Sequence, residues 1–137
     1  MNPRLAIHAT LDAFHTAAAE ADGQTYFALL APDAVFIGTD ASERWSRSEF
    51  ETFARPRFEG DSAWIYTPIE RHITVLDSGD FAWFDERLSH ARHGETRSSG
   101  VLQRTEAGWR IRQYVLSFAI PNAAAAEVVA VIAKVGE

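Results

Sequence analysis

Several residue types and motifs with well-known chemistry are missing from this sequence. It contains no cysteine, which excludes disulfide bonds, thiolate metal sites and cysteine nucleophiles. It shows no glycine-rich phosphate loop, no nucleophile elbow and no zinc-protease motif. Ser99 and Ser117 have no histidine beside them to activate a hydroxyl, so serine hydrolase chemistry is not indicated.

A long apolar run is missing as well. The first residues, MNPRLAIHATLDAF, are interrupted by His8 and Asp12, so we expect neither a signal peptide nor a transmembrane span. The net charge is -6 and the acidic residues are spread along the chain, which argues against nucleic-acid binding and against a polybasic membrane contact. We therefore expect a soluble, cytoplasmic protein.

The 137 residues, 47% of them hydrophobic, are enough for one core and too few for two ordinary domains, which predicts a single domain over residues 1–137. An apolar stripe predicts a first helix over about residues 3–21; its members are Ile7, Leu11, Phe14, Ala18 and Ala21. A shorter helix is expected through Tyr26 and Leu30, before Pro32. A short buried strand over 34–38 should follow, and then a third helix with Ser48 and Glu51 as its capping box.

The second half of the chain has the pattern of long strands. Runs over 64–76, 81–92, 96–103 and 109–118 are separated by turn residues such as Gly79, Gly94 and Gly108, which predicts an antiparallel meander. A last helix is expected over 123–135, capped by Asn122, with Val128, Val131, Ile132 and Val135 as its apolar side. Helices followed by a sheet that bends around them indicate an α+β fold.

Alternation along residues 109–118 predicts which side chains share a face. It groups Trp109, Ile111, Gln113, Val115 and Ser117 on one side and Arg110, Arg112, Tyr114, Leu116 and Phe118 on the other. Both faces carry apolar residues, so both should be covered. We expect the protein's own helices on the first face and a second copy of the chain on the outer one, which predicts a homodimer.

Taken together, several phrases of this sequence resemble the nuclear transport factor 2-like superfamily, and within it the SnoaL-like branch of small bacterial proteins. The phrases are GTDASERW (38–45), WIYTPIERHI (64–73), AWFDERL (82–88), RSSGVL (97–102) and WRIRQYVLSFAIPN (109–122). The resemblance covers essentially the whole chain and implies a cone-shaped cavity between helices and a concave sheet, with frequent dimerisation through the outer sheet face. Members of this superfamily range from isomerases and cyclases to binders without catalytic activity, so the fold does not choose a reaction. The tyrosine and paired aspartates with which ketosteroid isomerase relatives polarise a ketone have no match in this chain.

The candidate site combines polar groups with aromatic residues, the usual composition of a small-molecule pocket. Asp85 and His15 are the candidate acid–base groups, because a carboxylate or imidazole inside a partly apolar cavity can exchange protons near neutral pH. An ion pair of Asp85 with Arg87 or Arg97 is the structural alternative. The candidate ligand-binding residues are Trp45, Trp64, Tyr66, Trp83, Arg97, Gln113 and Ser117.

His8, Asp12 and His15 have a spacing that a metal site could use. A solvated helix face explains the same spacing better, so we predict no metal site and no cofactor. Three functional hypotheses stay open at this point. The first is a small-molecule-binding domain of unknown ligand, the second a cofactor-independent isomerase, cyclase or lyase for a hydrophobic carbonyl compound, and the third an interaction module that uses its outer sheet.

Overall fold

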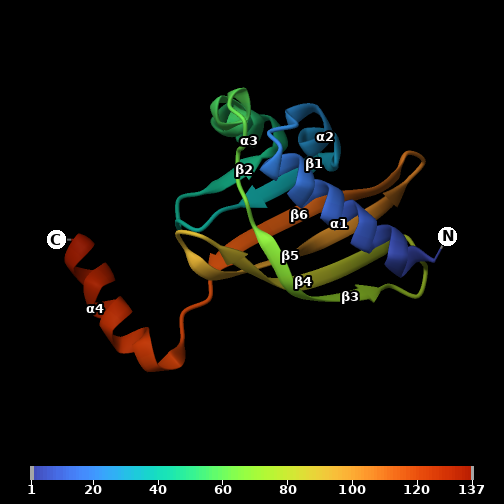
Figure 1. Ribbon diagram of the computed structural model, residues 1–137. Helices are drawn as coiled ribbons and strands as arrows, with labels where there is room; N and C mark the ends of the chain where they lie inside the picture. Colours follow the sequence, from blue (N-terminus) through green and yellow to red (C-terminus); the bar gives the residue numbers. More distant parts are fainter. Residues whose placement is uncertain (1, 137) are drawn as a thin grey trace.

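A computed structural model describes residues 2–136 and shows an α+β fold (Figure 1). Its helices are α1 (Pro3–Ala19), α2 (Gly23–Ala28), α3 (Arg47–Ala54) and α4 (Ala125–Val135), with short 3-10 helices η1 (Arg55–Glu59) and η2 (Asn122–Ala124). Its strands are β1 (Leu30–Ile37), β2 (Arg44–Ser46), β3 (Thr67–Val75), β4 (Phe81–His90), β5 (Gly94–Thr105) and β6 (Gly108–Phe118). The predicted order of helices, meander and last helix is confirmed.

The strands form one sheet in the order β2-β1-β6-β5-β4-β3, in which β1 runs parallel to β6 and all other neighbours are antiparallel. The sheet curves without closing, and α1 lies across its concave side (Figure 1). The core fills the space between the helices and this concave face. Its largest fully buried apolar side chains are Ile7, Leu11, Phe14, Leu30, Phe50, Leu88, Leu102 and Ile111, each worth about 1.5–3 kcal/mol of transfer free energy.

The predicted stripe of α1 is confirmed from Ile7 to Ala18, all of whose members are buried. Asn2 caps the helix by accepting a hydrogen bond from the Arg4 N–H, and Pro3 occupies the first turn, where its missing N–H costs nothing. The helix ends at Ala19 and not at Ala21, because Ala21 takes a left-handed conformation with φ 57°. The first strand begins earlier than predicted, since Leu30 already pairs with Ile111.

The cap of α3 differs from the prediction. Ser46, and not Ser48, accepts a hydrogen bond from the Glu49 N–H at 3.2 Å, and the Glu49 carboxylate accepts one from the Ser46 N–H at 2.9 Å. The same spacing occurs two residues earlier in the chain, so the sequence offers two capping boxes and the structure uses the first. The cap predicted for the last helix is also wrong, because Asn122 begins η2 and makes no side-chain cap.

The alternation predicted along β6 is wrong after Ile111. Leu102 pairs with Ile111 and Val101 pairs with Gln113, so Arg112 is an extra residue in the strand, a β-bulge. One inserted residue exchanges the two faces for the rest of the strand. Tyr114 therefore joins Trp109 and Ile111 on the concave, buried face, and Gln113 lies on the convex face.

The last helix, α4, stands apart from the sheet (Figure 1). None of its residues is buried, and Val129, Val131, Ile132 and Val135 are 61–83% exposed. Within residues 2–136 there is no helix both long and apolar enough to cross a membrane.

Candidate functional site

A cavity of about 160 Å³ opens between the helices and the concave face of the sheet. Residues from several elements line this cavity: α1 contributes Phe14 and His15, α3 contributes Phe50, and β6 contributes Tyr114. Most of its lining is aromatic, and its remaining aromatic residues are Tyr26, Phe36, Trp45, Phe53, Trp64 and Tyr66. The polar lining residues besides the tyrosines are His15, Thr39, Glu43 and His93.

The aromatic rings hold each other in place. Phe36 stacks on Phe50 with ring centroids 3.9 Å apart and an interplanar angle of 7°, and Trp45 stacks on Phe53 at 4.4 Å. Such contacts add about 0.5–1.5 kcal/mol per pair beyond the area that they bury. The walls of the cavity are therefore preformed.

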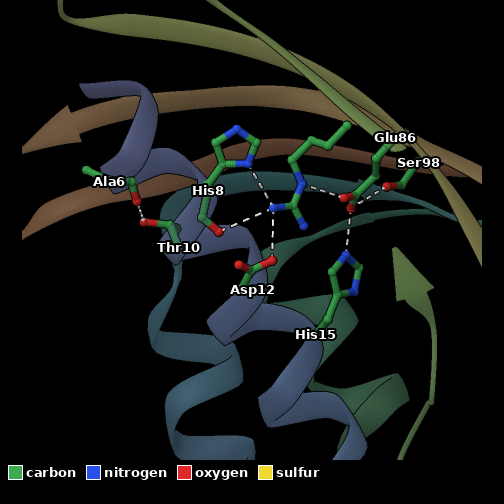
Figure 2. Close-up of polar contacts among 8 residues, drawn as sticks. Ala6, His8, Thr10, Asp12, His15, Glu86 and Ser98 are labelled. Carbon is green, nitrogen blue, oxygen red and sulfur yellow. Dashed lines mark hydrogen bonds and ion pairs between the residues drawn. The ribbon is translucent and has the colours of Figure 1, made fainter. Parts of the chain in front are cut away.

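His15, which lines the cavity, contacts the buried carboxylate of Glu86 (Figure 2). Its Nε2 lies 2.6 Å from Oε1 of Glu86, whose side chain is fully buried. Ser98 donates its hydroxyl to the same Oε1 at 3.0 Å. Oε2 accepts a hydrogen bond from Nε of Arg71 at 2.6 Å. Both oxygens of Glu86 are thus satisfied, as a buried carboxylate requires.

Arg71 connects this cluster to the first helix. Its Nη1 lies 2.9 Å from Oδ1 of Asp12, 3.2 Å from Nδ1 of His8 and 3.4 Å from the His8 carbonyl oxygen. The arginine side chain is only 7% exposed, whereas that of Asp12 is 64% exposed. His8 and Asp12, which together with His15 had a metal-like spacing, thus contact an arginine, and no group of metal ligands is found in residues 2–136.

The site combines ionised and neutral groups. Burial by itself raises the pKa of Glu86, but the hydrogen bonds from His15 and Arg71, together with the charge of the guanidinium, outweigh it and hold the pKa below the ordinary value of 4.5. Burial raises the pKa of Tyr114 and of Tyr26 well above 10. Both tyrosines are consequently neutral hydrogen-bond donors at pH 7, while Glu86 is a carboxylate.

The structure places four of the predicted site residues in the cavity lining: His15, Trp45, Trp64 and Tyr66. The expectation that Trp83, Asp85, Arg97, Gln113 and Ser117 face the cavity is wrong, because all five lie on the convex face, where each is exposed. On β4 the concave face carries Ala82, Phe84, Glu86 and Leu88, so the alternate residues Trp83 and Asp85 point the other way. Gln113 and Ser117 come after the bulge in β6, which places them on the convex face.

The predicted ion pair of Asp85 does not occur among the described residues, since Arg87 pairs with Glu70 at 3.0 Å and with Glu95 at 2.7 Å. Glu86, Arg71, Ser98 and Tyr114 were not among the site residues predicted from the sequence. One signal for Glu86 was present in the sequence. Phe84 and Leu88 alternate as core residues, and the position between them on the same face is a glutamate; a carboxylate at a core position is a functional-site signal.

Solved structures of low sequence identity share this fold. A proposed aromatic ring hydroxylase from Novosphingobium aromaticivorans matches with a TM-score of 0.70 at 22% identity over 86% of this chain and 90% of its own. A proposed dehydratase of the nuclear transport factor 2-like family from Streptomyces avermitilis has a TM-score of 0.73 at 15% identity, over 87% and 97% of the two chains. A proposed ketosteroid isomerase from Parabacteroides distasonis has a TM-score of 0.65 at 15% identity, over 84% and 86%.

A comparison with curated proteins finds no match. A comparison with protein families finds one: the model of the SnoaL-like domain matches residues 7–121.

Proposed function

Because the chain belongs to the family of SnoaL-like domains, we propose that it binds a small, neutral and largely apolar molecule in the aromatic cavity. The observation that carries this proposal is the lining, which is mainly aromatic and contains only a few polar groups. The volume of about 160 Å³ suits one ring, because apolar cavities of about 150 Å³ in other proteins take up benzene.

The charges around the cavity favour a neutral ligand. Glu43 is part of the lining, the chain carries a net charge of -6, and Glu86, a buried carboxylate beside the cavity, is already paired with Arg71. An anionic ligand would meet these carboxylates in a poorly hydrated space, which disfavours it. His15 is the cavity residue that can accept a hydrogen bond from a hydroxyl of the ligand.

Binding is tested with acetophenone as a neutral ring compound and benzoate as its anionic counterpart, followed by tryptophan fluorescence and thermal unfolding. Trp45 and Trp64 line the cavity and should report acetophenone binding with a Kd of about 1 mM, typical of a fragment of this size. Ala18→Leu fills part of the cavity and should weaken binding, whereas Trp83→Phe on the convex face is the matched control. Equal binding of benzoate, or undiminished binding by Ala18→Leu, would contradict the proposal.

A second candidate function is catalysis without a cofactor, as an isomerase, cyclase or lyase acting on a hydrophobic carbonyl compound. The 2.6 Å contact between His15 and the buried Glu86 favours it, because a carboxylate that orients an imidazole is a common arrangement for proton transfer. His15, and not Asp85, is the proton shuttle in this proposal. It would take a proton from the carbon next to the carbonyl, leave an enolate, and return a proton to carbon.

Exchange of the methyl protons of acetophenone for deuterium in D₂O, followed by proton NMR, tests this step without knowledge of the natural substrate. His15→Gln should slow enzyme-dependent exchange at least about 100-fold. Asp85→Asn should leave it unchanged. No exchange above the buffer rate with wild-type protein that binds acetophenone would favour a pure binding function.

We further propose that the convex sheet face mediates homodimerisation, with Trp83 in place of the Tyr114 and Leu116 predicted from the sequence. Trp83 is 48% exposed on this face, and its cross-strand partners are Thr74 and Val101. Tryptophan is among the residue types that are enriched at protein–protein interfaces. Light scattering should give twice the mass of one chain for the wild-type protein and the mass of a single chain for Trp83→Glu. A monomeric wild-type protein would contradict dimerisation.

A further inference from the structure

The charges of the cluster behind the cavity have to balance, because its central carboxylate has no access to water. Glu86 has a side-chain exposure of 0%, and a buried carboxylate is stable only beside a compensating positive charge. Two groups could supply that charge: the Arg71 guanidinium, 2.6 Å away, or a protonated His15, also 2.6 Å away.

Arg71 already supplies the whole charge. A guanidinium cannot lose its proton under ordinary conditions, so Arg71 and Glu86 together are neutral. A protonated His15 would add a second positive charge to a group of side chains that are 0–8% exposed. Among residues 2–136, the only other carboxylate in contact with the cluster is that of Asp12, which is 64% exposed and reaches Arg71, not His15.

The hydrogen bonds also determine which ring nitrogen of His15 carries the proton. A carboxylate only accepts hydrogen bonds, so Nε2, which faces Glu86, is the protonated nitrogen. Nδ1 makes no hydrogen bond within residues 2–136, yet it is not among the fully buried unpaired atoms, which are Arg71 Nη2 and Thr96 Oγ1. Since His15 lines the cavity, this accessible Nδ1 is the ring nitrogen left for a ligand to meet.

We propose that Arg71 is the positioning residue of this site: its fixed charge balances Glu86, so that His15 is a neutral imidazole with its proton on Nε2 and a free lone pair on Nδ1. The proposal rests on the proposed function in one respect: it takes the cavity as the place where a ligand meets Nδ1. There Nδ1 accepts a proton or a hydrogen bond. The expected ligands therefore carry a hydrogen-bond donor or an acidic C–H group beside a carbonyl.

The other titratable groups around His15 leave this balance intact. Tyr114 on β6 and Tyr26 on α2 are neutral, as their raised pKa values require. Asp12 and His8 on α1 contact Arg71. Glu43 and His93 belong to the cavity lining and form no ion pair with His15.

Nitrogen-15 NMR of the histidine side chains tests the proposal without any ligand, because the ring shifts report which nitrogens carry protons. The His15 signals are assigned by their loss in His15→Gln. Wild-type protein at pH 7 should show neutral His15 with the proton on Nε2. In Arg71→Met the ratio of imidazolium to neutral His15 should rise about tenfold or more, because His15 then becomes the only counter-charge of Glu86. Arg71→Lys should restore the wild-type ratio.

The matched control is Arg87→Met on the convex face, where Arg87 pairs with Glu70 and Glu95; it should leave the His15 signals unchanged. A merely structural role of Arg71 would lower stability without changing the protonation of His15, and an unchanged His15 spectrum in folded Arg71→Met protein overturns the proposal. If Arg71→Met does not fold, the spectrum of the wild-type protein is the test. An imidazolium form of His15 at pH 7, or a neutral His15 with its proton on Nδ1, would overturn the proposal. Because no ligand is added, a failure here is separate from a failure of ligand binding.

Discussion

Replacing Glu86 by glutamine is the sharpest test of the buried cluster. The change removes one charge and almost no volume, but it leaves the Arg71 guanidinium, 7% exposed, without a buried partner. The amide can also accept through only one of its two ends, so its NH₂ group has to face donors that met a carboxylate oxygen. Breaking a buried pair in this way costs about 3–5 kcal/mol, a large part of the total of about 5–15 kcal/mol for a domain.

The assay is urea unfolding followed by tryptophan fluorescence at pH 7. With a slope of about 2 kcal/mol per molar urea, Glu86→Gln should move the midpoint down by about 1.5 M or more. Glu95→Gln is the matched control, because that glutamate pairs with Arg87 on the surface, where both side chains are 42% exposed. An exposed pair contributes about 1 kcal/mol at most, so the control midpoint should shift by less than about 0.5 M.

A double-mutant cycle separates the charge effect from a general packing defect. The loss in the double variant Arg71→Met with Glu86→Gln should be smaller than the sum of the single losses, because the unpaired charge has gone. Equal midpoints for wild type and Glu86→Gln, or strictly additive losses, would refute the reasoning.

The pH dependence has a determined sign. The pKa of Glu86 in the folded protein lies below its ordinary value of 4.5. A carboxyl group with a depressed pKa stabilises the fold above its unfolded pKa, and this contribution is lost as the pH falls through the lower folded value. Wild-type stability should therefore fall below about pH 4.5 more steeply than that of Glu86→Gln.

Other predictions concern the parts of the fold that place the cavity. Ser46→Ala should cost about 1 kcal/mol in urea unfolding, because it removes the cap of α3, whereas Ser48→Ala should be close to neutral. Gly100→Ala should lower the free energy of unfolding by about 2 kcal/mol or more, because an added Cβ would lie 1.9 Å from the carbonyl oxygen of Gln113 beside the bulge. Gly60→Ala, with no atom within 4 Å, is its control, and equal effects of the two substitutions would contradict this reasoning. Removal of residues 123–137 should leave the midpoint of the monomer unchanged, because α4 buries no side chain; a large loss would show that α4 packs against the domain in solution.

The amino-acid sequence by itself determined the class of fold. Periodicity in α1, turn glycines at positions 79, 94 and 108, and long β-branched runs are properties of neighbouring residues, so they were readable without coordinates, and they led to an α+β domain with a meander. Three of the four aromatic residues predicted to line the cavity, Trp45, Trp64 and Tyr66, do line it, whereas Trp83 does not.

Only the tertiary structure decided which face each strand presents and which distant residues meet. The extra residue Arg112 exchanges the faces of β6, and no local pattern in the sequence marks that bulge. The contact of His15 with Glu86 spans 71 positions, and it depends on the angle at which α1 crosses the sheet, which is set by packing of the whole core. The sequence therefore pointed to His15 on the first helix, but its other acid–base candidate, Asp85, lies on the opposite face of β4 from Glu86, the carboxylate that His15 contacts.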